Sequence, residues 1–241
     1  MRTIRCHVDA PLSVGATATL SETASGHVVR VLRLGVGDAV VLFNGDGHDY
    51  DARLVAVGKR GAEAEVLGAR RLANESPLVI TLAQGVARGE KMDLVLQKGT
   101  ELGVAAFAAI NTERTEVKLD AERSAKRMAH WQGVLVAACE QSGRARVPAL
   151  APPVALAQWA GGPHAGLKLM LDPEGELTLA ALPATDTVTL VVGPEGGLSE
   201  RDLATLRAAG FKGLRLGPRI LRTETAGLAA IAALQSRLGD L

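Results

Sequence analysis

The chain has 241 residues, of which 47% are hydrophobic, 22% are charged and 2% are aromatic, and its formal net charge is +1. This composition excludes a disordered tail and fits a folded, soluble protein of one or two domains. A net charge so close to zero gives no bulk signal for nucleic-acid binding, so any basic surface has to be local.

The first residues carry no apolar run that would serve as a signal peptide, and no stretch reaches the length of a membrane span. The cysteines, Cys6 and Cys139, lack the spacing of a disulfide framework or of a metal site. We therefore expect a cytoplasmic protein with free thiols, no bound metal ion and no membrane contact.

The N-terminal part, residues 2–72, contains short apolar or alternating runs at 17–20, 39–43 and 51–57, separated by Gly and Asp. This pattern is typical of a small β-barrel. Residues 44–47 (NGDG) lie between two such runs, and their Gly and Asn residues supply the positive φ that a tight hairpin needs. Oxygen ligands do not continue at the spacing of a calcium loop, which favours the hairpin.

A short polar linker ending in Pro77 follows, and after it strands alternate with helices, as in an α/β domain. We therefore predict two domains, 1–72 and 77–241. The expected strands of the second domain are 78–82, 105–110, 167–171, 187–192 and 214–216. Its expected helices are 90–102, 121–141 behind Asp120, one between the N-cap Ser199 and Gly210, and 223–238.

A glycine-rich turn, residues 193–197 (GPEGG), directly follows a predicted buried strand and precedes the helix capped by Ser199. Ligands bind at such places in open α/β folds, and glycine lets backbone amides approach a ligand without an intervening Cβ. The spacing matches neither a Walker loop nor a dinucleotide fingerprint. A plain strand-to-helix turn is the structural alternative.

A second loop, residues 216–226, is rich in polar and backbone-exposing residues and runs straight into the last helix. The two loops converge only if the strands that precede them are neighbours. In a purely structural interpretation, Arg219 and Arg222 are solvated and Thr223 or Thr225 caps the helix.

Further polar clusters lie at the end of the long helix and after the strand 105–110. Arg144 and Arg146 either contact RNA or stabilise the helix C-terminus through its dipole. Arg114 is long enough to reach a phosphate or a base edge.

Four motifs, KGTELGV (98–104), EQSGR (140–144), GPEGG (193–197) and LGPRILRTETA (216–226), resemble those of the bacterial small-subunit ribosomal RNA uridine-N3 methyltransferases. That family belongs to the SPOUT class of knotted methyltransferases, and the resemblance covers essentially the whole chain. It implies a mostly parallel SPOUT α/β domain with a trefoil knot, an N-terminal PUA-like β-barrel that docks RNA, and a homodimer.

The resemblance also implies S-adenosylmethionine as cofactor and N3 of a uridine in 16S ribosomal RNA, within the small ribosomal subunit, as methyl acceptor. The cofactor residues that it implies are Leu171, Gly193, Glu195, Gly196, Gly197, Leu216, Gly217, Ile220 and Leu221. The expected RNA contacts are Arg114, Glu140, Gln141, Arg144 and Arg222.

Direct methyl transfer to N3 requires alignment of the reacting atoms, removal of the N3 proton, and donors for charge that develops on the uracil oxygens. The expected catalytic residues are Glu195 as base and Arg222 and Arg114 as donors. In the alternative interpretation, Glu195 only orients its loop. Two other functions stay open. One is a different SPOUT methyltransferase acting on a ribose 2′-oxygen or a guanine, and the other is a non-enzymatic RNA-binding module.

Overall fold

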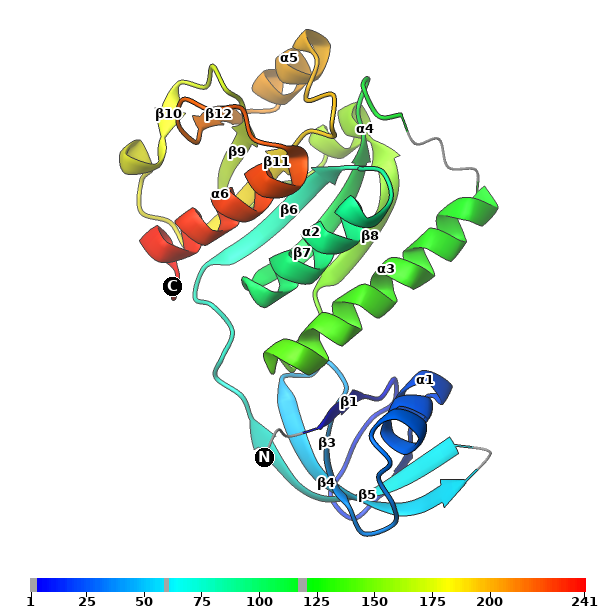
Figure 1. Ribbon diagram of the computed structural model, residues 1–241. Helices are drawn as coiled ribbons and strands as arrows, with labels where there is room; N and C mark the ends of the chain where they lie inside the picture. Colours follow the sequence, from blue (N-terminus) through cyan, green and yellow to red (C-terminus); the bar gives the residue numbers. More distant parts are fainter. Residues whose placement is uncertain (1–3, 59–60, 117–120) are drawn as a thin grey trace. The chain divides into compact units, whose positions relative to one another are not determined.

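The computed structural model describes residues 4–58, 61–116 and 121–241, and these form two compact units (Figure 1). Unit 1 comprises the chain up to Glu75 together with Val136–Val147, and unit 2 comprises Ser76–Leu135 and Pro148–Leu241. The segment Val136–Val147 contains the end of the long helix, which the sequence interpretation assigned to the second domain. The boundaries 1–72 and 77–241 stay a prediction.

Unit 1 is built on a five-stranded sheet of order β1-β3-β4-β5-β2, in which β1 and β3 are parallel and the other pairs are antiparallel. Buried Ala62, Ala64 and Val66 alternate with exposed Glu63 and Glu65, so one face of β5 packs into the core. The elements are β1 (Arg5–His7), β2 (Thr17–Thr19), α1 (Glu22–Gly26), a π-helical turn (His27–Val31), β3 (Ala39–Phe43), β4 (His48–Gly58) and β5 (Gly61–Arg71). The predicted hairpin between β3 and β4 is confirmed, with Gly45 and Gly47 at positive φ.

The interior of unit 1 encloses a carboxylate, Asp49, which is 1% exposed. It forms ion pairs with Arg5, whose side chain is 9% exposed, and with the more open Arg70. Arg5 also donates to the carbonyl of Arg144 at 3.1 Å, and the guanidinium of Arg144 pairs with Glu75. These contacts attach the segment Val136–Val147 to the strands of unit 1.

Unit 2 contains a seven-stranded sheet of order β10-β12-β9-β11-β6-β7-β8, and every neighbouring pair is parallel. Its strands are β6 (Val79–Gly85), β7 (Val104–Asn111), β8 (Ala149–Ala155), β9 (Leu167–Leu171), β10 (Leu177–Thr178), β11 (Thr187–Val192) and β12 (Lys212–Arg215). Its helices are α2 (Glu90–Glu101), α3 (Ala121–Ser142, which ends in unit 1), α4 (Leu156–Ala160), a 3₁₀ turn (Leu179–Ala181), α5 (Glu200–Ala208) and α6 (Thr223–Leu238).

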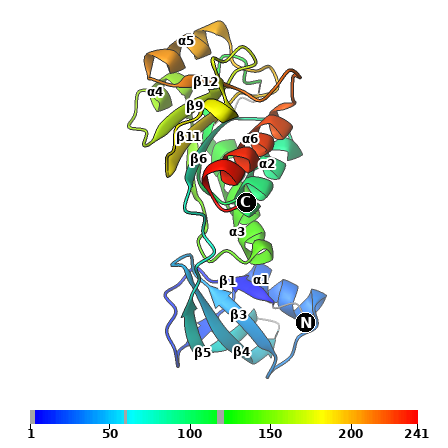
Figure 2. The same ribbon diagram turned by 90° about the vertical axis from the view of Figure 1, so that its left-hand side faces the viewer.

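Helices cover both faces of this sheet (Figure 2). On one face, Met170 of β9 belongs to a core with Leu156 of α4 and Leu206 of α5. On the other face lie α2 and α6, and a Cβ on Gly99 of α2 would come within 2.9 Å of the Phe107 ring. Burial on both sides explains why β9 and β11 are nearly continuous apolar runs.

Most of the predicted elements are confirmed, and the strands 167–171 and 187–192 and the helix 223–238 match to the residue. The expected α/β class with a mostly parallel sheet is confirmed as well. The elements β1, α1 and β5 of unit 1, the elements β8, α4 and β10 of unit 2, and the π-helical and 3₁₀ turns were not predicted. Asp120 lies outside the described residues, and the trefoil knot stays a prediction. Among the described helices, none has the length and apolar character needed to cross a membrane.

The strand order reverses beside β11. The strands β6, β7 and β8 lie in this order on one side of β11, whereas β9 and β12 lie on its other side. Because all these strands are parallel, the segments that follow β6, β9, β11 and β12 leave the same edge of the sheet. In open α/β sheets, this reversal marks the edge at which ligands bind.

We predict that Asp49→Ala lowers the free energy of unfolding by about 3–5 kcal/mol, because it leaves the buried Arg5 guanidinium without its counterion. Arg70→Ala is the matched control. Arg70 is 54% exposed, so its loss should cost about 0.2–1 kcal/mol. Urea unfolding of both variants measures the difference, and equal destabilisation would contradict the assigned role of Asp49.

Candidate active site

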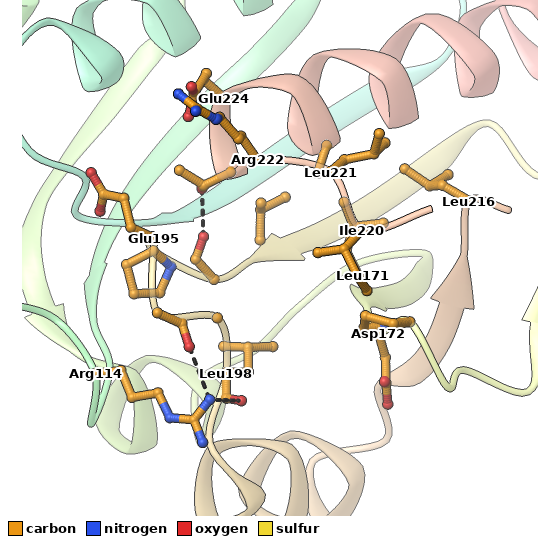
Figure 3. Close-up of a pocket in the computed structure, with 18 of the residues that line it drawn as sticks. Arg114, Leu171, Asp172, Glu195, Leu198, Leu216, Ile220, Leu221, Arg222 and Glu224 are labelled. Atoms are coloured by element: carbon orange, nitrogen blue, oxygen red, sulfur yellow. Dashed lines mark hydrogen bonds between the residues drawn. The ribbon is translucent and has the colours of Figure 1, made fainter. Parts of the chain in front are cut away.

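A cavity of about 550 Å³ lies in unit 2 at the carboxyl ends of β9, β11 and β12 (Figure 3). Three segments, 171–173, 192–198 and 214–226, supply nearly all of its lining, and Lys91, Arg114 and Leu203 complete it. The volume is in the range of small-molecule sites. All nine expected cofactor residues line the cavity: Leu171, Gly193, Glu195, Gly196, Gly197, Leu216, Gly217, Ile220 and Leu221.

The loop after β11 is a closed turn. The amide of Gly197 donates to the carbonyl of Pro194 at 2.8 Å, and Gly197 has a φ of 69°. A Cβ on Gly193 would lie 2.8 Å from the backbone carbon of Gly197, a distance that real side chains do not adopt. The loop therefore needs glycine for its own shape, and it also lines the cavity.

A buried amide side chain, Gln84 at the end of β6, joins this loop to the start of α6. Its Nε2 lies 2.9 Å from Thr223 Oγ1 and 3.3 Å from the Gly193 carbonyl oxygen. Thr223 Oγ1 in turn donates to the Gly193 carbonyl at 2.6 Å. The sequence interpretation did not select Gln84, because a single glutamine at a strand end carries no signal.

Arg114, expected as a donor to the substrate, is already engaged with the loop. Its Nη1 donates to the carbonyl of Gly196 at 2.9 Å and to that of Leu198 at 3.4 Å (Figure 3). A Cβ on Gly196 would lie 3.1 Å from Arg114 Cβ. Arg114 thus stabilises the loop through two of its carbonyls, and a catalytic role for it stays a prediction.

Glu195, expected as the base, is held by donors from the start of α2. Its Oε1 accepts from the amide of Arg88 at 2.9 Å and from Lys91 Nζ at 3.0 Å. Partial burial acts to raise the pKa of Glu195, but these hydrogen bonds and the Lys91 charge outweigh it, and the pKa lies below its ordinary value. The carboxylate is ionised near neutral pH and is a weaker base than a free glutamate.

The loop after β9 is anchored by Asp172, which the sequence interpretation also missed. Asp172 is 5% exposed, its Oδ2 accepts from Arg207 at 2.9 Å, and its amide donates to the Leu214 carbonyl at 3.2 Å. These contacts tie the loop to α5 and β12.

The third loop carries the most exposed groups of the site. Ile220 is 79% exposed and Gly217 has a φ of 117°, so the backbone bends where few side chains are tolerated. Arg222 precedes α6 as its N-cap, and it caps the helix without a side-chain hydrogen bond. In Figure 3, Arg222 and Glu195 lie at one side of the cavity, and Leu216 lies at the other.

Three expected RNA contacts belong to unit 1 and are absent from the cavity lining. Glu140 Oε1 accepts from the His7 amide at 3.0 Å, and Arg144 is 5% exposed and pairs with Glu75. Gln141 is exposed. These contacts give Glu140 and Arg144 a structural role within unit 1, and RNA binding by the three residues stays a prediction.

The cavity fits the expected cofactor in its shape and chemistry. Its apolar side, with Leu171, Leu216 and Ile220, suits an adenine ring, and the backbone of 193–197 offers polar groups without side chains. Of the loop's glycines, Gly197 has open space where a Cβ would lie, whereas a Cβ on Gly193 or Gly196 would meet the protein itself.

Known protein families match both the N-terminal and the C-terminal part of the chain. The family model of an RNA methyltransferase domain matches residues 74–235, and that of an RNA methyltransferase PUA domain matches residues 20–67. The PUA match confirms the expected class of the N-terminal part.

Relatives match over nearly the full length. The ribosomal RNA small subunit methyltransferase E of Buchnera aphidicola (from Schizaphis graminum) is 31% identical over 98% of this chain and 97% of its own. A methyltransferase from Legionella pneumophila solved with bound S-adenosylmethionine is 40% identical, covers both chains fully and has a TM-score of 0.97. The ribosomal RNA small subunit methyltransferase E of Neisseria gonorrhoeae, also bound to S-adenosylmethionine, is 40% identical over both full chains, with a TM-score of 0.92.

We predict that Gly196→Val abolishes binding of S-adenosylmethionine and leaves the fold intact. A β-branched side chain would push against Arg114 and fill space beside the loop backbone. Equilibrium dialysis with labelled S-adenosylmethionine measures the affinity, and circular dichroism checks the fold. Gly68→Val is the control, because nothing lies within 4 Å of a Cβ there. Unchanged affinity in Gly196→Val would remove the loop from the site.

Proposed function

The chain belongs to the ribosomal RNA small subunit methyltransferase E family, and on that premise we propose that it methylates N3 of a uridine in 16S ribosomal RNA. It is an S-adenosylmethionine-dependent ribosomal RNA methyltransferase. The observation that carries the proposal is the convergence of three loops on one cavity, in a chain whose solved relatives bind S-adenosylmethionine.

The residues that would hold the cofactor are Leu171 and the backbones of 193–197 and 216–221. When bound, S-adenosylmethionine supplies an electrophilic methyl group. The protein's main contribution is to hold the uracil ring in line with that group, because a well-oriented pair of reactants removes much of the entropic barrier. Arg222 is exposed at the rim of the cavity, and we assign it the role of donor to the uracil oxygens as N3 loses its proton.

We assign Glu195 a positioning role. Its carboxylate accepts from Arg88 and Lys91, its pKa is lowered, and both features make it a poor acceptor for the N3 proton. Through Lys91 it ties the loop 193–198 to the start of α2. Loss of this contact would shift the loop without removing a reacting group.

The function is tested by incubating the protein with S-adenosylmethionine and small ribosomal subunits from a strain that lacks the enzyme, followed by mass spectrometry of the nucleosides. The expected product is 3-methyluridine. A ribose 2′-O-methyl nucleoside or a methylguanosine would assign the chain to another reaction. Absence of both methyl transfer and cofactor binding would support the RNA-binding module. Naked 16S RNA in parallel shows whether the assembled subunit is required.

We predict that Glu195→Gln lowers kcat by less than about tenfold, since only a half-exposed ion pair with Lys91 is lost. A positioned base would instead be worth about 10² to 10⁴ in rate. Because the pKa of Glu195 is lowered, the carboxylate is ionised at and above neutral pH, so the pH profile there should keep its shape. Arg222→Lys, which keeps the charge and loses the planar fork of donors, should lower kcat more than Glu195→Gln. A loss of kcat in the range of a positioned base for Glu195→Gln would instead identify Glu195 as the base.

We also propose that the protein is a cytoplasmic homodimer, that its last segment passes through the trefoil knot, and that unit 1 docks the RNA. The family membership supports these points, and homo-oligomers usually close with two-fold symmetry. Sedimentation should show one species of twice the chain mass of 25.0 kDa. A monomer that is fully active at assay concentration would contradict the dimer.

A further inference from the structure

We propose that Gln84 is a positioning residue for cofactor binding, which sets the separation between the loop 193–198 and the start of α6. The inference rests on the proposed function, because it concerns the same cavity. Gln84 itself is absent from the lining of the cavity and is fully buried behind it. It would therefore act on the cofactor only through the groups that it holds.

The side-chain amide of Gln84 donates hydrogen bonds to acceptors in its own strand, in the loop after β11 and at the start of α6. Its Nε2 lies 2.9 Å from Thr223 Oγ1, 3.0 Å from the Gly85 carbonyl and 3.3 Å from the Gly193 carbonyl. Thr223 donates to the same Gly193 carbonyl. β6, the loop after β11 and the first turn of α6 are thereby joined by one buried polar group.

Two glycines show that the backbones of these segments approach one another closely around Gln84. A Cβ on Gly85 would lie 2.5 Å from the backbone nitrogen of Pro194, so the end of β6 and the loop after β11 are in direct contact. A Cβ on Gly227 would lie 3.6 Å from Gln84 Oε1, which brings α6 against the same side chain. The three segments meet around Gln84 with little space to spare.

The amide of Gln84 lowers the stability of the fold in one respect, because one of its two polar atoms has no partner in the part of the chain that the structure describes. Gln84 Oε1 is buried and has no hydrogen-bond partner among the described residues. A buried acceptor without a partner is destabilising, and an apolar side chain of similar size would avoid that penalty. We attribute the presence of the amide to its donor group, because the directional hydrogen bonds of the NH₂ group fix one geometry where apolar contacts allow several.

The geometry of the cavity depends on this contact. Gly193 begins the loop that lines one wall, and Thr223 directly follows Arg222 and the loop 216–222 that lines another. If Gln84 and Thr223 released the Gly193 carbonyl, the two walls could move apart. Replacement of Gln84 should then lower cofactor affinity, although Gln84 itself does not line the cavity.

The test uses the full-length protein with Gln84→Met, which keeps the size of the side chain and removes its donors, and with Thr223→Val, which keeps its shape and removes the hydroxyl. Each has a matched control. Gln235→Met removes a fully buried glutamine that donates to the Leu102 carbonyl, and Thr189→Val removes a buried hydroxyl that donates to the Ala165 carbonyl. Thr223→Ser restores the hydroxyl. Melting temperature, the Kd for S-adenosylmethionine and the KM values for cofactor and ribosomal substrate are measured for all five.

We expect Gln84→Met and Thr223→Val each to raise the cofactor Kd by about tenfold and to leave the KM for the ribosomal substrate unchanged. Thr223→Ser should bind as the wild type does, and the two controls should keep wild-type affinity even where their melting temperatures fall. In the double variant, Gln84→Met with Thr223→Val, the Kd should rise by less than the product of the single effects, because both remove one network.

The inference is overturned if folded Gln84→Met and Thr223→Val bind the cofactor like the wild type. It is equally overturned if Gln235→Met and Thr189→Val weaken binding in proportion to their loss of stability, because the effect would then be general. If Gln84→Met does not fold, Gln84→Leu, which also lacks the donors, takes its place, because Thr223 itself lines the cavity and its variants do not isolate the indirect effect. Failure of the wild type itself to bind S-adenosylmethionine would instead refute the proposed function.

Discussion

The parallel pairing of β11 between β6 and β9 is the constraint on which the rest of unit 2 depends. It places four strand ends at one edge, on both sides of the point where the strand order reverses. Segments that are far apart in sequence, 171–173, 192–198 and 214–226, meet there and enclose one cavity. No single motif creates the site, because each loop supplies only one wall.

Polar side chains outside the reacting centre hold these walls in place. Gln84 and Thr223 donate to the Gly193 carbonyl, Arg114 donates to two carbonyls of the same loop, and Asp172 anchors the loop after β9. Arg114 and Glu195, which the sequence suggested as catalytic groups, therefore hold the loop 193–198 in its conformation. Such preorganisation suits a transfer whose main requirement is the alignment of the reacting atoms.

The sequence predicted most of the long elements and the glycine loops. It missed the strand Gly61–Arg71 and the contacts that depend on partners distant in the chain. Strands such as 187–192 and the helix 223–238 carry strong local patterns, so their bounds could be read directly. The attachment of Val136–Val147 to unit 1, through contacts such as that of Arg144 with Glu75, has no local signature. For the same reason the sequence could name Glu195 as a charged group of the site, but not the Lys91 contact that lowers its pKa.

A crystal structure of this protein with S-adenosylmethionine would show whether the cofactor binds where the three loops converge. We predict that the adenosyl group lies against Leu171 and the backbones of 193–197 and 216–221. A second cavity of about 470 Å³ lies between α2 and α3, near Asp93 and Trp131. Cofactor bound there, with the loops around Gly193 empty, would contradict the account.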